Sequence, residues 1–288
     1  MTDVTQTPSQ PSSWGREWRK IRGNKMLVTG GIVLLIFLLA IIVGPEITGY
    51  DYAKMSIRER FQGPSFAHWM GTDNYGRDTL AKVIHGARVA FFVGAISVGI
   101  GMVGGMTIGA IAGFVGGFID NILMRITDAL LAFPPLLLAI GLVAATGPST
   151  TTVSVIIGII YIPRFARVMR GAVMAEASKE YVEAARAVGQ EPWRILFFHI
   201  GPATLSPIIV LATVVFALAI IIEASLSFLG LGVPPPTPSW GGMLSESRSF
   251  MTKNIWMAIF PGLTISVAVL GLNLLGDGLR DYLDPKDY

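Results

Sequence analysis

Long apolar segments constrain this chain more than any other feature of its sequence. Residues 26–43 carry no charge, and a helix of this length rises about 27 Å, close to the roughly 30 Å hydrocarbon core of a bilayer. Their length also favours a retained helix over a cleaved signal peptide. Five further apolar segments span residues 89–115, 129–146, 150–170, 205–230 and 255–276. Because 52% of all residues are hydrophobic and 14% are charged, the sequence predicts an all-α integral membrane protein with six transmembrane helices.

The distribution of basic residues predicts the orientation of the chain. Six spans place both termini on one side, where 14 of the 22 Lys and Arg residues fall. The positive-inside rule therefore predicts that both termini are cytoplasmic. We expect a disordered and basic cytoplasmic segment at 1–25, a first helix at 26–43, an extracytoplasmic loop at 44–88, a five-helix core at 89–276 with a cytoplasmic loop at about 171–204, and a cytoplasmic tail at 277–288.

Several kinds of chemistry are excluded by the sequence. The chain has no cysteine, which rules out disulfides and thiolate metal sites, and its three histidines form no HExxH arrangement. It contains neither a G-x-S-x-G nucleophile motif nor a G-x-x-x-x-G-K-[ST] phosphate loop. A formal net charge of +3 gives no reason to expect nucleic acid binding. We therefore expect a protein that contacts membrane lipid and has no catalytic residues, no metal site and no bound cofactor.

Two of the expected spans carry features of helix packing. Glycines at every fourth position of the second span share one face, which is typical of a close helix contact, with a sliding gate as the alternative. They are Gly101, Gly105, Gly109, Gly113 and Gly117. In the third span, Pro134-Pro135 predicts a bend, and Arg125 and Asp128 are spaced to pair on one face.

Glu223 is the one acidic residue between Leu205 and Gly230, within the fifth expected span. A carboxyl group at this depth is costly unless it is paired or faces water. Two interpretations stay open: Glu223 lines a translocation path, or it fixes the bundle through a hydrogen bond to another helix. Ser227 lies four residues later and shares its helical face, so it belongs to the same candidate path.

The loop at about 171–204 has the pattern of two short helices. Ser178 is expected to cap a helix over 179–188, Gly189 suits the left-handed position that ends it, and Pro192 suits the first turn of the next. Ala184 and Ala185 have little bulk, which lets a partner approach the backbone. Glu180, Glu183 and Arg186 supply directed polar contacts. We interpret the loop as a docking element, with a merely solvated connection as the alternative.

Glu183, Ala184, Ala185 and Gly189 resemble the EAA motif of ABC importer permeases. The segment His199-Ile200-Gly201-Pro202 stands where that family usually ends in Ile-x-Leu-Pro, so Gly201 departs from the pattern. Other stretches are similar to the second (C-type) permease subunit of dipeptide, oligopeptide and nickel importers. These are residues 68–73, 76–78, 226–232, 234–241, 278–281 and 283–285.

The resemblance implies a type I ABC importer permease fold in a prokaryotic inner membrane. It also implies a homologous second permease subunit, two cytoplasmic ATP-binding subunits that hold ATP and Mg²⁺, and an extracytoplasmic substrate-binding protein. The loop around Glu183 would couple this chain to the ATP-binding subunits. Dipeptides, oligopeptides, glutathione-like peptides and nickel chelates all remain open as substrates.

The outer segments leave further alternatives open. Asp73, Arg77 and Asp78 either brace the loop that contains them or contact the binding protein, and Trp240 is expected at the membrane interface. Arg164, Arg167 and Arg170 recur every third residue, as in voltage sensors, but we expect them where the fourth helix leaves the membrane, and no filter sequence is present. An ion-gradient-coupled transporter that uses Glu223 is the alternative from another class.

Overall fold

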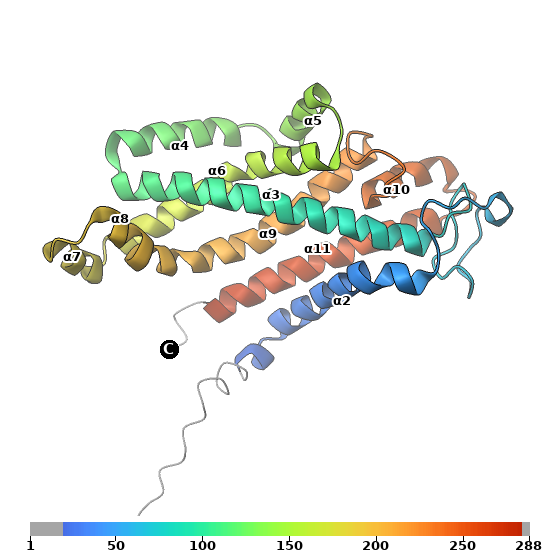
Figure 1. Cartoon of the computed structure of the whole chain (residues 1–288), viewed down its shortest axis with the longest axis horizontal. Helices are drawn as coiled ribbons and strands as arrows, with labels where there is room; N and C mark the ends of the chain where they lie inside the picture. The colour runs from blue at the N-terminus through green and yellow to red at the C-terminus, as the bar shows by residue number, and fades with distance from the viewer. Residues whose placement is uncertain (1–19, 284–288) are drawn as a thin grey trace, which may run out of the picture.

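The computed structural model describes residues 20–283, and this part of the chain is helical apart from loops and one isolated β-bridge, Thr72 with Asp78. The expected disorder of residues 1–15, the basic residues Arg16 and Arg19, and the segment 284–288 lie outside the described residues. The long helices run roughly along one direction (Figure 1). In chain order the α-helices are α2 (Lys25–Thr48), α3 (Thr79–Val115), α4 (Gly117–Leu131), α5 (Pro135–Thr146), α6 (Thr150–Ala177), α7 (Glu180–Ala187), α8 (Pro192–Arg194), α9 (Gly201–Phe228), α10 (Trp240–Ser247) and α11 (Trp256–Leu283).

Five stretches among the described residues are long and apolar enough to cross a membrane: Lys25–Gly44, α3, α6, Pro192–Phe228 and α11. The stretch Pro192–Phe228 joins α8, a π-helical segment Ile195–Ile200 and α9. The third expected span is different, because α4 and α5 meet at a bend of 85°. The bend falls at Pro134-Pro135, as predicted, since proline cannot donate the backbone hydrogen bonds that would continue α4. Six crossings result if the bent pair crosses as one.

Several expected boundaries need correction. The second helix begins at Thr79, ten residues before the apolar segment that predicted it, because the Asp78 carboxylate accepts a hydrogen bond from the Ala81 amide at 2.7 Å and caps the helix. The loop expected at 44–88 is therefore shorter and includes a turn of 3₁₀ helix at Ile57–Glu59. The fourth helix continues through Pro163 to Ala177, which places Arg164 near its middle instead of at its exit.

The closest helix contact joins α3 and α6, which run in parallel. A Cβ atom placed on Gly105 would lie 2.7 Å from the Ile162 carbonyl oxygen, and one on Gly113 would lie 2.7 Å from the Arg170 carbonyl oxygen. Gly101 and Gly109 approach α6 in the same row. The expected fifth member, Gly117, was wrong: α3 ends at Val115, and Gly117 has a φ of +59° at the turn into α4.

Ion pairs tie α4 to α6. Asp120 accepts two hydrogen bonds from the Arg170 guanidinium, at 2.5 and 2.7 Å. Asp128 pairs with Arg167 at 2.7 Å, so the expected pair between Asp128 and Arg125 was wrong. The chain turns back between α3 and α4, which brings the arginines of α6 alongside α4 and gives Asp128 a partner on another helix.

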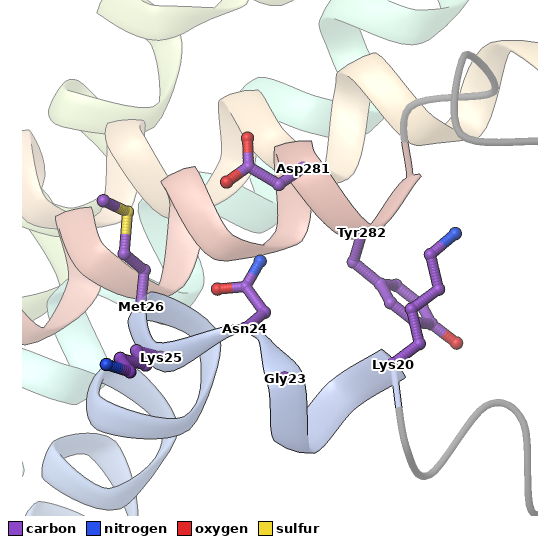
Figure 2. Close-up of a pocket in the computed structure, with 7 residues that line it drawn as sticks. All are labelled: Lys20, Gly23, Asn24, Lys25, Met26, Asp281 and Tyr282. Atoms are coloured by element: carbon purple, nitrogen blue, oxygen red, sulfur yellow. The ribbon is translucent and has the colours of Figure 1, made fainter.

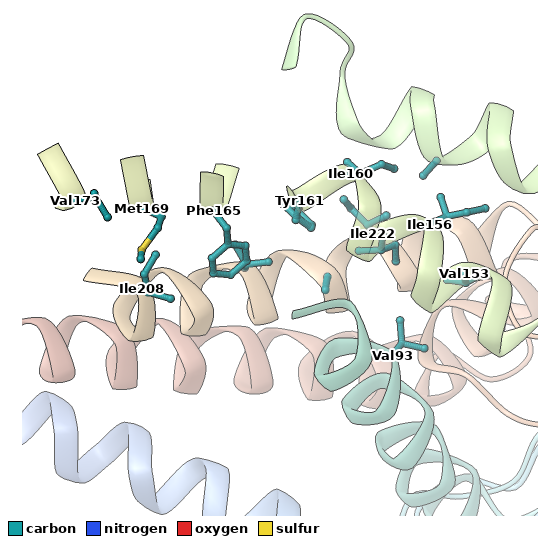
Figure 3. Packing of buried hydrophobic residues seen from close by; sticks show 14 of the residues in the cluster. Val93, Val153, Ile156, Ile160, Tyr161, Phe165, Met169, Val173, Ile208 and Ile222 are labelled. Carbon is teal, nitrogen blue, oxygen red and sulfur yellow. The ribbon is translucent and has the colours of Figure 1, made fainter. Parts of the chain in front are cut away.

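Two clusters of buried hydrophobic residues hold the helices together. The larger cluster contains Phe165, Ile157 and Ile208 and connects α3, α5, α6, α7 and α9. Figure 3 shows part of it, including Phe165 of α6 and Ile208 of α9. The smaller cluster surrounds Trp240 and connects α3, α9, α10 and α11. Trp240 is fully buried and its indole nitrogen donates to the Val83 carbonyl at 2.9 Å, so the expected interfacial position was wrong.

The first and last described residues lie at the same end of the bundle as α7 (Figure 1). The Asn24 side-chain amide donates to the Gly278 carbonyl at 3.2 Å, and the Lys20 ammonium lies 5.7 Å from the centre of the Tyr282 ring. Lys20, Asn24 and Tyr282 line a shallow cavity of about 430 Å³ between α2 and α11 (Figure 2). The structure has five helices long enough to cross a membrane, or six spans if the bent pair counts as one.

Candidate functional site

The loop between α6 and α9 forms the helix, turn and helix expected from the sequence. The short helix α7 ends at Ala187, and Gly189 follows two residues later with a left-handed φ of +76°. The Gly189 amide donates to the Arg186 carbonyl at 3.0 Å. Pro192 then begins α8. A side chain at Gly189 would meet no atom within 4 Å, so glycine is required there by backbone conformation and not by space.

The two faces of α7 have different surroundings. Val182 and Ala185 are buried in the larger cluster, together with Ile195 and Ile200 of the π-helical segment. Glu180, Glu183, Ala184 and Arg186 are exposed. Ala185 therefore anchors α7 to the bundle and is not open to a partner, which corrects the expectation that both alanines face outward. Helical geometry separates the adjacent residues 184 and 185 by about 100° around the axis.

Ser178 does not cap α7. Its hydroxyl donates back to the Ala175 carbonyl at 3.0 Å, and the capping position is held by Lys179, which makes no side-chain cap. Lys179 instead pairs with Glu176 at 2.6 Å, and the Tyr181 hydroxyl donates to the same carboxylate at 2.7 Å. These contacts fix the turn between α6 and α7 from outside, while the buried residues fix it from inside.

Exposed aromatic side chains follow the turn. Trp193, Phe197 and Phe198 are 54%, 68% and 67% exposed, and Val188 is 82% exposed. Together with the polar face of α7, they make one exposed surface at the end of the bundle. We call α7 and the following residues to Ile200 the docking loop.

At the opposite end of the bundle, four charged side chains form an interlocked network. Asp73 accepts hydrogen bonds from the Arg77 guanidinium at 2.6 Å and the Lys82 ammonium at 2.7 Å. Glu246 of α10 accepts from the same two cations, at 2.6 and 2.7 Å. Burial opposes ionisation of Asp73, but Lys82 and Arg77 hold the pKa of its carboxyl group below the usual value. We call these residues the outer network.

Asp78 lies beside this network and acts as a brace. Its carboxylate caps α3 and also lies 2.8 Å from Nδ1 of the buried His68. Asp73 and Asp78 are 2% and 4% exposed, and 13% of the Arg77 side chain is exposed. Of the two alternatives for these three residues, the geometry favours bracing of the loop.

The structure places Glu223 and Ser227 in contact. The Ser227 hydroxyl donates to Oε1 of Glu223 at 2.7 Å, and Glu223 is fully buried. Its Oε2 atom has no hydrogen-bond partner among the described residues. Ser227 also lines a cavity of about 690 Å³ between the end of α9, the proline-rich loop and α10, where Arg77, Lys82 and Glu246 form part of the wall. Glu223 does not line this cavity.

Sequence reasoning missed Lys82 and Glu246. The spacing of Lys82 from Asp78 along α3 was a usable signal, because residues four apart share a helical face. Nothing in the spacing links Glu246 to Asp73, since the contact depends on how α10 packs against α3. Arg164 was recognised in the sequence, but the helix that carries it was ended at residue 170 instead of Ala177.

Long apolar helices, a bent span and a loop that is anchored on one face and exposed on the other are the features of a multi-pass membrane protein. Residues 105–286 match the family described as binding-protein-dependent transport system inner membrane component, and residues 12–64 match the N-terminal transmembrane domain of oligopeptide transport permease C. The first match covers more than half of the chain. The chain therefore belongs to this family of ABC transporter permeases and is a multi-pass protein of the bacterial inner membrane.

Similar proteins have been assigned to peptide transport. The dipeptide transport system permease protein DppC of Alkalihalophilus pseudofirmus is 44% identical over 96% of this chain and 90% of its own length. The glutathione transport system permease protein GsiD of Pectobacterium atrosepticum is 42% identical over 98% and 94%. The di/tripeptide transport system permease protein DppC of Pseudomonas aeruginosa is 38% identical over 96% and 93%. Members of such a family are transport components and not catalysts.

Proposed function

We propose that this chain is a permease subunit of an ATP-driven importer of peptides and forms half of the translocation pathway together with a homologous second permease. The energy would come from two cytoplasmic ATP-binding subunits, which hold ATP and Mg²⁺, and substrate would be delivered by an extracytoplasmic binding protein. The observation that carries this proposal is the docking loop, because its polar face is exposed while its apolar face is packed into the bundle.

The packing of α7 against the bundle would allow it to transmit movement from the ATP-binding subunits to the transmembrane helices. Val182 and Ala185 share a buried cluster with residues of α6 and α9, so a displacement of α7 is passed to both helices. Well-packed contacts transmit displacement because the interior cannot be compressed. Closure of the ATP-binding subunits would thus rock the bundle between outward-open and inward-open states.

Peptide substrates are favoured by the names of the three relatives, which specify a dipeptide, glutathione and a di/tripeptide. Glutathione itself is a tripeptide, so these names share one chemical class. A nickel chelate remains the alternative within the family.

The test is uptake by the complete complex in proteoliposomes, with ATP and binding protein but without an ion gradient. We expect Glu183→Ala and Gly189→Val to lower uptake of a radiolabelled dipeptide about tenfold while assembly is unchanged, because one removes a docking contact and the other opposes the left-handed turn. Glu46→Gln, an exposed carboxylate at the other end of the bundle, should leave uptake unchanged. Normal uptake by both loop variants, or uptake driven by an ion gradient alone, would contradict the proposal.

A further inference from the structure

Arg164 lies near the middle of α6, and its side chain is exposed on the surface of this chain without an ionic partner among the described residues. It stands between Ile162 and Ala166, the two residues of α6 whose backbones approach Gly105 of α3. Val115, where α3 ends, is ten residues further on, so Arg164 is about 15 Å from that end of the apolar helix. Arg167 and Arg170 have carboxylate partners on α4, but among residues 20–283 Arg164 has none.

An exposed arginine near the middle of a membrane-spanning helix requires either water or an anion, because lipid cannot solvate its charge. The structure provides a cavity for it. Arg164 lines a space of about 320 Å³ between α6 and the bend that separates α4 from α5, with Leu131 and Pro135 on the opposite wall. The bend therefore does more than shorten a span: it leaves room beside the guanidinium.

A second donor lies in the same cavity. Tyr161 lines it one helical turn before Arg164, and the described residues supply no hydrogen-bond partner for its hydroxyl group. Arg167 completes the wall, but its charge is matched by Asp128 at 2.7 Å. One uncompensated guanidinium and one phenol in a small cavity are suited to a single carboxylate, which guanidinium groups bind in a bidentate manner.

We propose that this cavity is a water-filled station on the translocation pathway and that Arg164, assisted by Tyr161, binds the terminal carboxylate of a peptide in transit. The identity of the anion rests on the proposed function, because peptides of every length carry this group. The site is distinct from the binding protein, which selects substrate before it enters the membrane. Arg164 is a binding residue in this proposal and Tyr161 an auxiliary donor.

The first test asks whether the cavity contains water and a net positive field. Because the chain has no cysteine, Leu131→Cys supplies the only thiol of this chain, at a position that is 37% exposed and lines the cavity. In the complete complex, we expect anionic sulfonatoethyl methanethiosulfonate to modify this thiol about fivefold faster than its cationic trimethylammonium analogue. Adding Arg164→Gln should bring the two rates together, while Arg164→Lys should preserve the preference.

Ile159→Cys is the matched control, since it is an exposed residue of α6 that does not line the cavity, and its rates should not respond to Arg164→Gln. Failure of both reagents to reach Leu131→Cys would show that the cavity is dry. Equal rates with Arg164 intact would show that a carboxylate of another subunit neutralises it. Either result overturns the proposal.

The second test measures transport. We expect Arg164→Gln to lower uptake of a radiolabelled dipeptide about tenfold and uptake of the same dipeptide amide less than twofold, since the pairing of a guanidinium with a carboxylate is lost in the first case alone. The binding protein is unchanged, so its own preference cancels when each substrate is compared between variants. Equal losses for both substrates would refute the carboxylate assignment. Uptake by the wild-type complex tests the proposed importer function separately.

Discussion

At the scale of single residues, the outer network converts four costly charges into a clamp between α3 and α10. Lys82 is 4% exposed and contacts two carboxylates, so removal of its ammonium would leave Asp73 buried beside a single remaining cation, Arg77. We expect Lys82→Met to destabilise the protein by about 2–3 kcal/mol, below the usual cost for a fully buried pair because Glu246 is partly exposed. Thermal unfolding of the purified complex measures this, with the exposed Lys54→Met as the unaffected control.

The same network gives a pH dependence with a defined sign. The pKa of Asp73 is lower in the folded protein than in the unfolded chain, where it is about 3.9. Its stabilising contribution is therefore complete above about pH 4 and is lost as the pH falls through the folded value. We expect the melting temperature to fall more steeply below pH 4 in the wild type than in Asp73→Asn. A parallel fall in both would show that other carboxylates dominate acid unfolding.

Substitutions of Glu223 can show whether its carboxyl group is structural or carries protons during transport. Glutamine keeps an acceptor for the Ser227 hydroxyl and removes the charge, so Glu223→Gln should preserve both thermal stability and ATP-driven uptake. Glu223→Ala should lower stability by about 2–4 kcal/mol, because it leaves a cavity and a hydroxyl without its acceptor. A proton-coupled transporter requires the opposite outcome for uptake, since the amide cannot titrate.

At the scale of elements, the contact of α3 with α6 shows which parts of the sequence were readable. The glycines at every fourth position predicted the packed face of α3, and Pro134-Pro135 predicted the bend between α4 and α5. Helix ends were harder to predict from the sequence. The boundary at Thr79 depends on a polar cap, and the end of α6 depends on carboxylates of α4 that pair with Arg167 and Arg170. The pattern of apolar residues indicates which segments are buried in lipid. The ends of α3 and α6 are set instead by polar contacts that this pattern does not contain.

A substitution in the glycine row between α3 and α6 tests whether these glycines are required for close packing of the two helices. We expect Gly109→Val to prevent normal assembly or to lower the melting temperature by more than about 10 °C, because an added Cβ would lie 2.7 Å from the Met169 Cβ and still closer to the Ala166 carbonyl. Gly99→Val, in the same helix, meets nothing within 4 Å and should be tolerated. Equal melting temperatures for the two variants would contradict a close seam.

At the scale of the whole molecule, the docking loop and the outer network lie at opposite ends of the bundle. The orientation of the bundle therefore decides which of them faces the cytoplasm. The two ends present highly exposed side chains, Val188 at 82% beside α7 and Phe66 at 102% in the loop before α3. The distribution of Lys and Arg predicts that Val188 faces the cytoplasm and Phe66 the opposite side.

Because the sequence lacks cysteine, each position can carry the only thiol of this chain. We expect a membrane-impermeant maleimide to label Phe66→Cys in intact spheroplasts and Val188→Cys only in inside-out vesicles, with both labelled after permeabilisation. Labelling of Val188→Cys in intact spheroplasts would reverse the orientation and remove the docking loop from the reach of cytoplasmic ATP-binding subunits. Labelling of both positions from one side would instead show that the bent pair of α4 and α5 returns without crossing. In that case only α3 and α6 would cross between residues 66 and 188, and two crossings place both residues on the same side.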